Sequence, residues 1–172
     1  MVPSGSKILV WVEPPEAYIR LVGRAALEGA RDFKALVRRL DHEGIRRFCL
    51  DLQECKIMDS TFSGVLAALA TDLGPLADEP NCSRLVLVGP NDRVRDLLDN
   101  LGVLQLVAVV SPDGRMERPG PAQELVREAA TKDEVAECCL EAHRFLEKLH
   151  PENRARFAEV TRLLEQQLQS SR

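Results

Sequence analysis

The spacing of hydrophobic residues along the chain switches repeatedly between the two-residue period of strands and the three-to-four-residue period of helices. Two short apolar stretches near the start are joined by Pro14-Pro15, and this arrangement predicts an antiparallel pair. The stretches that we expect to form strands are 7–12, 17–23, 47–52, 84–88 and 104–110. Helical spacing follows the second, third and fourth of these, at 33–40, 65–73 and 94–101. Strands that alternate with helices in this way predict an α/β sheet.

A segment rich in proline, glycine and charge separates this region from a purely helical C-terminal part. We therefore divide the chain into a sheet domain at 1–111, a linker at 112–121 and a helical hairpin extension at 122–172. His150-Pro151 separates the two helices, and proline suits the first position of a helix. Each helix has an apolar stripe that needs a partner, because isolated helices of this length are marginal in water. Packing on the chain's own sheet domain is the favoured arrangement, and a homodimer through these helices or a different protein are the alternatives.

Composition argues against several classes of function. The 172 residues carry a formal charge of −4 and no run of lysine and arginine, so we expect no direct binding to nucleic acid. One Trp and one Tyr offer little for stacking on bases. No apolar stretch is long enough to span a bilayer, and the N-terminus lacks a signal-peptide pattern. We therefore expect a cytoplasmic protein without membrane insertion.

The cysteines and histidines form no pattern typical of a catalytic or metal site. Five cysteines, two of them adjacent at Cys138-Cys139, fit neither a disulfide framework nor a metal-binding spacing, so we expect reduced thiols. The three histidines are scattered, with no nucleophile motif attached, and no glycine-rich phosphate loop is present. We therefore predict that the protein is not an enzyme and has no catalytic residues, metal ligands or cofactor.

The most informative local feature is Asp59-Ser60-Thr61, which lies where the apolar pair Ile57-Met58 gives way to a helix. Unpaired N–H groups and a partial positive charge at a helix start can hold either a capping side chain or a phosphate. Ser, Thr and Asp are the preferred capping residues, so one interpretation is that Ser60 or Thr61 merely caps the helix. The other interpretation is that this helix start holds a phosphate.

Two longer blocks around this junction carry a family resemblance. The segment 47–66, RFCLDLQECKIMDSTFSGVL, resembles the signature of STAS domains, which are shared by sulphate transporters and bacterial anti-sigma factor antagonists. The segment 85–103, LVLVGPNDRVRDLLDNLGV, resembles the strand and helix that come later in the family. Order and spacing agree over about 7–110. The resemblance implies a mixed sheet with an antiparallel first strand pair followed by parallel βα units.

The antagonist branch of this family implies a function. In that branch the serine after the aspartate is phosphorylated by a partner serine kinase, which is itself the anti-sigma factor. Carried onto this chain, the acceptor is Ser60, Thr61 is the second choice, and Asp59 takes the matching position. Partner contacts are implied for Asp59, Ser60, Thr61, Phe62 and Ser63. Phe62 is a departure, because many relatives have glycine there. The resemblance thus implies an anti-sigma factor antagonist that binds the kinase and is released by phosphorylation of Ser60.

Phosphorylation would act on such a complex as an electrostatic switch. A phosphoserine carries about −1.5 to −2 charges at pH 7, and beside Asp59 in a docked interface this charge increases repulsion and desolvation cost. Two non-catalytic alternatives remain. One is an accessory STAS subunit of a lipid-transport ATPase, in which the hydroxyl is structural. The other is a scaffold that assembles through the helices at 131–169. The chain from residue 122 onward lies outside the resemblance.

Overall fold

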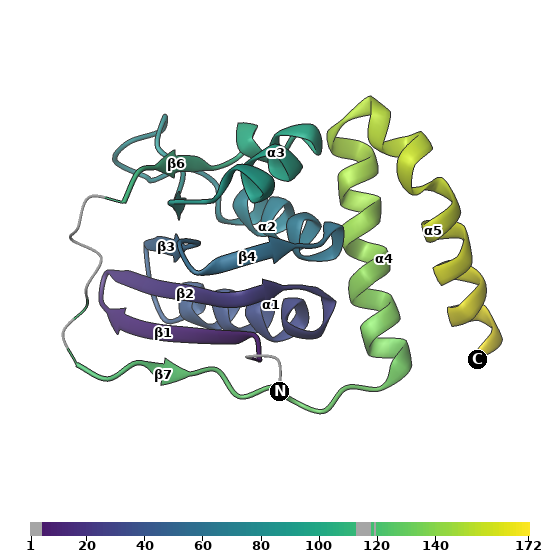
Figure 1. Cartoon of the computed structure of the whole chain (residues 1–172), viewed down its shortest axis with the longest axis horizontal. Helices are drawn as coiled ribbons and strands as arrows, with labels where there is room; N and C mark the ends of the chain where they lie inside the picture. Colours follow the sequence, from purple (N-terminus) through teal and green to yellow (C-terminus); the bar gives the residue numbers. More distant parts are fainter. Residues whose placement is uncertain (1–4, 113–117, 119) are drawn as a thin grey trace.

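A mixed β-sheet with α-helices packed against it forms the centre of the computed structural model, which describes residues 5–112, 118 and 120–172 (Figure 1). The strands are β1 (Lys7–Glu13), β2 (Glu16–Ala25), β3 (Arg47–Asp51), β4 (Cys55–Met58), β5 (Leu85–Val88), β6 (Ala108–Val110) and β7 (Gln123–Glu124). The helices are α1 (Leu27–His42), α2 (Ser60–Leu73), α3 (Asp92–Asn100), α4 (Lys132–Leu149) and α5 (Pro151–Ser170), with a short 3-10 helix η1 (Val103–Gln105). The sheet has the order β6-β5-β3-β2-β1-β7, and β4 pairs with β2 beside this path.

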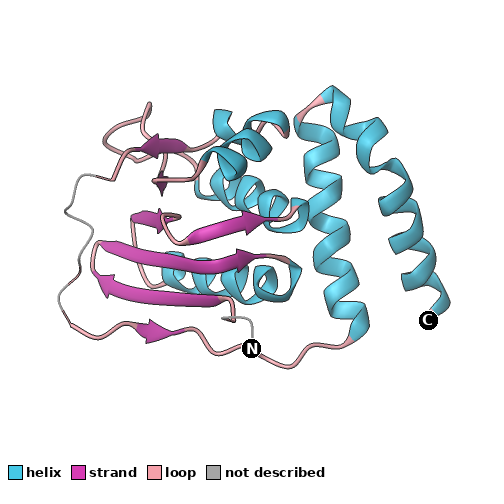
Figure 2. Ribbon diagram, in the orientation of Figure 1, coloured by secondary structure: helices cyan, strands magenta, loops and turns pink. Residues whose placement is uncertain are grey.

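The directions of the strands confirm the predicted mixed sheet. β1 and β2 are antiparallel, whereas β2 with β3, β3 with β5, and β5 with β6 are parallel. Along β2, the side chains of Ala17, Ile19 and Leu21 enter one hydrophobic core together with residues of α1, α2 and α3. The alternation of β2 therefore directs one face of the sheet toward these helices, as the two-residue period predicts (Figure 2).

Two strands differ from the prediction. The stretch at 104–110 was expected to be a strand throughout, but its first part is η1 and only β6 pairs in the sheet. Gly102, with a φ of 80°, turns the chain after α3, and the turn continues into η1 before the strand can begin. β4 was not predicted, because four residues are too few to show a period. It pairs with the last part of β2 after a shift of register at Gly23 and Arg24.

The start of the predicted hairpin extension also belongs to the sheet. β7 pairs antiparallel with β1, and the next residue, Leu125, donates its N–H to the carbonyl of Ile8. The helical hairpin itself begins at Lys132, after the extended segment 125–131. Of the predicted linker at 112–121, residues 113–117 and 119 lie outside the described residues.

The hairpin packs on the chain's own sheet domain, the arrangement that the sequence favoured. α4 begins with a capping box, in which the side chains and backbone amides of Thr131 and Glu134 pair reciprocally. Its apolar side then lies against α2 and α1 (Figure 1). Ala142 and Leu146 of α4 are buried in the same core cluster as the sheet and its helices. Asn153, fully buried at the start of α5, donates to the carbonyls of both Leu101 and Leu146, and so connects the hairpin to the end of α3.

Candidate functional site

Asp59 joins the starts of two helices. It is the N-cap of α2, where its Oδ1 accepts a hydrogen bond from the backbone N–H of Phe62 at 2.8 Å. Its Oδ2 accepts from the backbone N–H of Leu27, the first residue of α1, at 2.9 Å. Both carboxylate oxygens therefore neutralise unpaired donors at helix starts. The interpretation that Ser60 or Thr61 caps the helix is wrong, because Asp59 takes that position.

Ser60, the first residue of α2, directs its hydroxyl at a helix from the other end of the chain. Its Oγ lies 2.9 Å from Nε2 of His143 on α4. The other ring nitrogen of His143, Nδ1, lies 2.7 Å from the carbonyl oxygen of Cys139. A carbonyl only accepts, so Nδ1 carries a proton. In the neutral ring Nε2 is then the acceptor, and the Ser60 hydroxyl donates to it.

The residues after Ser60 are covered. Thr61 is 5% exposed, and its Oγ1 lies 3.3 Å from the Sγ of Cys139. Phe62 is 1% exposed and packs against Phe33 of α1, with 5.0 Å between the ring centroids. Ser63 is fully buried and donates its hydroxyl hydrogen to the carbonyl of Asp59. Of the five residues for which we expected partner contacts, only Asp59 and Ser60 therefore keep exposed surface in this conformation.

No motif in the sequence connected His143 with this junction. His143 is 4% exposed and stacks edge-on against Phe157 of α5, so it belongs to the interior of the hairpin. One signal was present in the sequence. Cys139 and His143 are four residues apart, so both lie on one face of a helix and can contact the same neighbour.

Hydrogen bonding shifts the pKa values of both His143 and Cys139. Burial favours the neutral imidazole, but the hydrogen bonds with Cys139 outweigh it, and the pKa of His143 is raised. Burial also favours the neutral thiol, yet hydrogen bonds with His143 and Thr61 outweigh it, and the pKa of Cys139 is lowered. Cys49, also partly exposed, behaves in the opposite way, because burial raises its pKa. Cys139 is therefore the more readily ionised of these two thiols.

We expect iodoacetamide to alkylate Cys139 faster than Cys49 in the folded protein. The thiolate is the reactive form, and the lowered pKa of Cys139 gives it a larger thiolate fraction at neutral pH. The advantage is greatest below the ordinary thiol pKa of about 8.5, where a thiol with a raised pKa is almost entirely protonated. Peptide mass spectrometry over a pH series measures both rates. His143→Gln is expected to reduce the rate at Cys139 alone, and equal rates at the two thiols in the parent would contradict the assignment.

A second buried polar cluster lies within the sheet. Asp51 is 1% exposed and accepts hydrogen bonds from the hydroxyl of Tyr18, from Nε of Arg20 and from the backbone N–H of Gln53. Burial, with the charge of Asp51, raises the pKa of Tyr18 well above its ordinary value. Since the Asp51 carboxylate is satisfied by these donors, the cluster ties β2 to β3 and we assign it a structural role.

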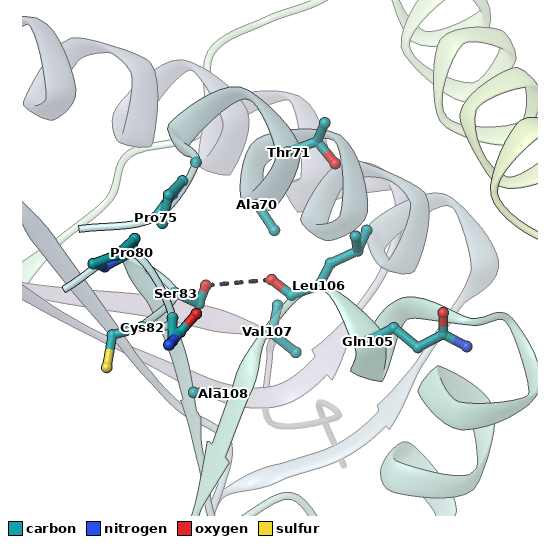
Figure 3. A pocket seen from close by; sticks show the side chains of 12 residues that line it. Ala70, Thr71, Pro75, Pro80, Cys82, Ser83, Gln105, Leu106, Val107 and Ala108 are labelled. Carbon is teal, nitrogen blue, oxygen red and sulfur yellow. Dashed lines mark hydrogen bonds between the residues drawn. The ribbon is translucent and has the colours of Figure 1, made fainter. Parts of the chain in front are cut away.

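The cavity of about 460 Å³ shown in Figure 3 is separate from this junction. It lies beside Ser83, which precedes β5, and Leu106, which precedes β6, and the Ser83 hydroxyl donates to the Leu106 carbonyl at 3.3 Å (Figure 3). Ser60 follows β4, so the two sites are at opposite ends of the parallel strands. None of the residues lining the cavity is charged. Among the described residues, no cluster of His, Cys, Asp and Glu could hold a metal ion, and no helix could cross a membrane.

Comparisons with known proteins show which family the chain is similar to. The family profile described as "Mlab, STAS domain" matches residues 12–108. Among solved structures, the unphosphorylated anti-sigma factor antagonist SpoIIAA is 16% identical with a TM-score of 0.52, and the match covers 63% of this chain and 90% of that one. A putative anti-sigma factor antagonist from Thermotoga maritima is 18% identical with a TM-score of 0.51, covering 61% and 86%. No curated protein matches.

These findings confirm the resemblance and set its extent. The two structural matches show a shared fold, and the profile spans β2 to the start of β6, including Asp59 and Ser60. It ends before α4 and α5, so His143 and Cys139 are contributed by a part of the chain that the profile does not include. The chain therefore belongs to the STAS domain family.

Proposed function

We propose that this protein is an anti-sigma factor antagonist that regulates transcription by partner switching. It binds a serine kinase that is also an anti-sigma factor, and phosphorylation of Ser60 releases it. One observation carries this proposal. Asp59 supplies the cap of α2, so the Ser60 hydroxyl is not needed to begin the helix and is available for another role.

The charges around Ser60 support release rather than tighter binding. A helix start ordinarily favours an anion, but here the carboxylate of Asp59 already accepts the N–H groups of Phe62 and Leu27. A phosphoryl group on Ser60 would add a second negative charge beside Asp59. In a docked interface, repulsion of about 3 kcal/mol would weaken binding by about 150-fold.

Modification also requires a change in the position of α4. The 2.9 Å between Ser60 Oγ and His143 Nε2 is a hydrogen-bond distance and leaves no room for a phosphoryl group between them. We therefore propose that the kinase acts on a state in which α4 has moved away from the start of α2. Phosphorylated Ser60 would then keep α4 from returning to its present position.

The test is phosphorylation by an anti-sigma serine kinase with ATP. We expect one phosphoryl group, which mass spectrometry locates at Ser60, and no modification of the Ser60→Ala protein. Thr61→Ala, which removes the second-choice acceptor, is expected to be modified like the parent. Binding to the kinase should survive in Ser60→Ala and weaken by about a hundredfold in Ser60→Asp. Equal binding by the alanine and aspartate variants would show that Ser60 is not a switch.

A second candidate is a non-catalytic accessory STAS subunit, for example of a lipid-transport ATPase. The contacts of the two hydroxyls favour it, since Ser60 is hydrogen-bonded to His143 and Thr61 is buried against Cys139. In this function both hydroxyls are structural, and they hold the hairpin on the domain. The protein would then remain bound to the ATPase during purification whether or not it had been treated with phosphatase.

We further propose a cytoplasmic location, where ATP-dependent kinases act, and no direct contact with nucleic acid. A homodimer or scaffold through the C-terminal helices would have to use the outer side of α5. There Val160 is 39% and Leu163 is 50% exposed, whereas the buried side chains of α4 are used within the chain.

A further inference from the structure

A second cavity, of about 410 Å³, lies where α1 meets the edge of the sheet. Its wall includes Ile8 of β1, Gly29 and Asp32 of α1, and the chain from Glu124 of β7 to Arg127. β7 is the last strand beside β1, so this cavity is at the border of the sheet (Figure 1). Its volume is in the range of sites that bind small molecules. We name it the edge cavity, and it shares no residue with the Asp59-Ser60-Thr61 junction.

Asp32 brings a carboxylate without a partner to the wall of the edge cavity. Asp32 is only 8% exposed, yet within the described part of the chain its carboxylate makes no hydrogen bond and no ion pair. Buried polar groups are almost always hydrogen-bonded, and a buried charge is costly unless it is paired. Asp32 also lies beyond the first turn of α1, where an acidic side chain would offset the helix dipole. Neither capping nor the dipole therefore explains an aspartate at this position.

The other charged side chains in this wall have partners. Glu124 Oε2 lies 3.7 Å from Nζ of Lys7. The guanidinium of Arg127 donates to the backbone carbonyl of Ser6 at 3.3 Å. Among the described residues that line the edge cavity, Asp32 therefore carries the unmatched charge. Because that charge is negative, the cavity favours a cation over an anion.

The rest of the wall leaves room for an apolar group. A Cβ atom built on Gly29 would meet only Ile8 Cδ1, at 3.6 Å, so the backbone of α1 is open to the cavity there. The side chains of Ile8 and Leu125 pack against the core and give the cavity apolar walls. Glycine disfavours a helix, and Gly29 lies about one turn before Asp32 on the same buried face. Two residues that suit the buried face of a helix poorly thus border one cavity.

We propose that the edge cavity binds a small organic cation, a protonated primary amine on a short apolar chain. The ammonium group donates to the carboxylate of Asp32, and the hydrocarbon part lies against Ile8 and Leu125. A calcium or magnesium ion fits less well, because it needs about six oxygen ligands and the described residues hold no cluster of acidic or other metal-binding side chains. Binding gives the buried carboxylate the partner that the described chain does not supply. The inference does not depend on the proposed function.

The experiment titrates n-butylamine into the full-length protein at neutral pH and constant ionic strength, and follows the backbone amides by NMR. We expect saturable shifts at Gly29, Asp32 and Leu125. 1-Butanol has the same chain without the charge, and butyrate has the opposite charge. We expect 1-butanol to bind about tenfold more weakly than the amine, and butyrate not to bind. Equal affinity for the amine and the alcohol would overturn the assignment of a cation site.

Asp32→Asn removes the charge and keeps the shape of the side chain. The affinity for n-butylamine is expected to fall about tenfold or more. The matched control is Asp96→Asn, which removes the same charge from an exposed position of α3 and should bind like the parent. Asp32→Asn should also resist urea at least as well as this control, because it removes a buried charge without a partner. Undiminished binding, or a clear loss of stability that reveals a structural partner for the carboxylate, overturns the proposal.

Gly29→Leu tests the location of the site independently of the charge. A leucine side chain at residue 29 extends into the edge cavity, so we expect it to abolish binding of n-butylamine. Gly29→Ala adds a single carbon and should retain binding. If both variants bind like the parent, the amine binds elsewhere and the proposal fails. Should Gly29→Leu fail to fold, which circular dichroism would show, Asp32→Asn and its control decide the question alone.

Discussion

Phe62→Ala is expected to lower the free energy of unfolding by about 3–5 kcal/mol, the usual range for deleting a buried aromatic ring. Phe62 is 1% exposed in the middle of the core cluster, and its ring packs against that of Phe33. Alanine would leave a cavity between α1 and α2, directly beneath the start of α2. Urea denaturation followed by circular dichroism measures the loss.

Phe62→Leu is the control that keeps most of the side-chain volume at residue 62. Leucine fills much of the space, so we expect a cost of less than about 1.5 kcal/mol. A cost below about 1 kcal/mol for Phe62→Ala would mean that the ring does not belong to the core. The result also bears on function, since a residue so deeply packed anchors the candidate site rather than contacting a partner.

Gly64→Ala is expected to cost about 2 kcal/mol, although alanine is the better helix former. The added Cβ would meet the backbone of Ala142, which cannot rotate away as a side chain could. α2 and α4 must therefore move apart, and Leu146 and other buried residues of the hairpin lose contacts. Chemical denaturation gives the change in stability, and hydrogen exchange shows whether the loss is concentrated in α4.

Gly29→Ala is the matched control, because Gly29 is also a buried helical glycine. A Cβ at residue 29 would meet only Ile8 Cδ1 at 3.6 Å, an ordinary contact. This substitution should be neutral or stabilise the protein by about 0.5–1 kcal/mol, through the helix propensity of alanine. Similar losses at both positions would show that the close approach of α2 and α4 is not what sets the cost at Gly64.

The Asp59-Ser60-Thr61 junction shows how much of the local structure a short sequence pattern can predict. The sequence predicted a helix start there, and α2 begins at Ser60. The interpretation that Ser60 or Thr61 caps the helix was wrong, because Asp, Ser and Thr are almost equivalent caps in isolation and the local pattern cannot choose among them. The choice depends on Leu27, whose backbone N–H also needs an acceptor and is brought beside Asp59 by the folding of β2 and α1. Of the Asp, Ser and Thr side chains at this junction, only the carboxylate offers a separate oxygen to each donor.

His143 shows what a short sequence pattern cannot predict, namely a contact between distant parts of the chain. Its contact with Ser60 joins residues 83 positions apart, and no periodicity in the sequence carries information over that separation. The apolar stripe of α4 predicted that the helix needs a cover, but stripes of this kind fit many surfaces. The helix settles where Gly64 lets the backbones approach and where Arg31 and Lys34 match its carboxylates.

The sequence by itself determined the mixed sheet, the order of its main helices, the family, and Ser60 as the hydroxyl at the start of α2. These follow from local periods and short motifs, because strand alternation, helix spacing and turn chemistry act over a few residues. Only the tertiary structure decided that Asp59 is the cap, that Phe62 is core, and that α4 contacts Ser60 and covers Thr61. Each of those depends on packing between segments distant in the chain, where shape and charge complementarity select one contact among many that the sequence would allow.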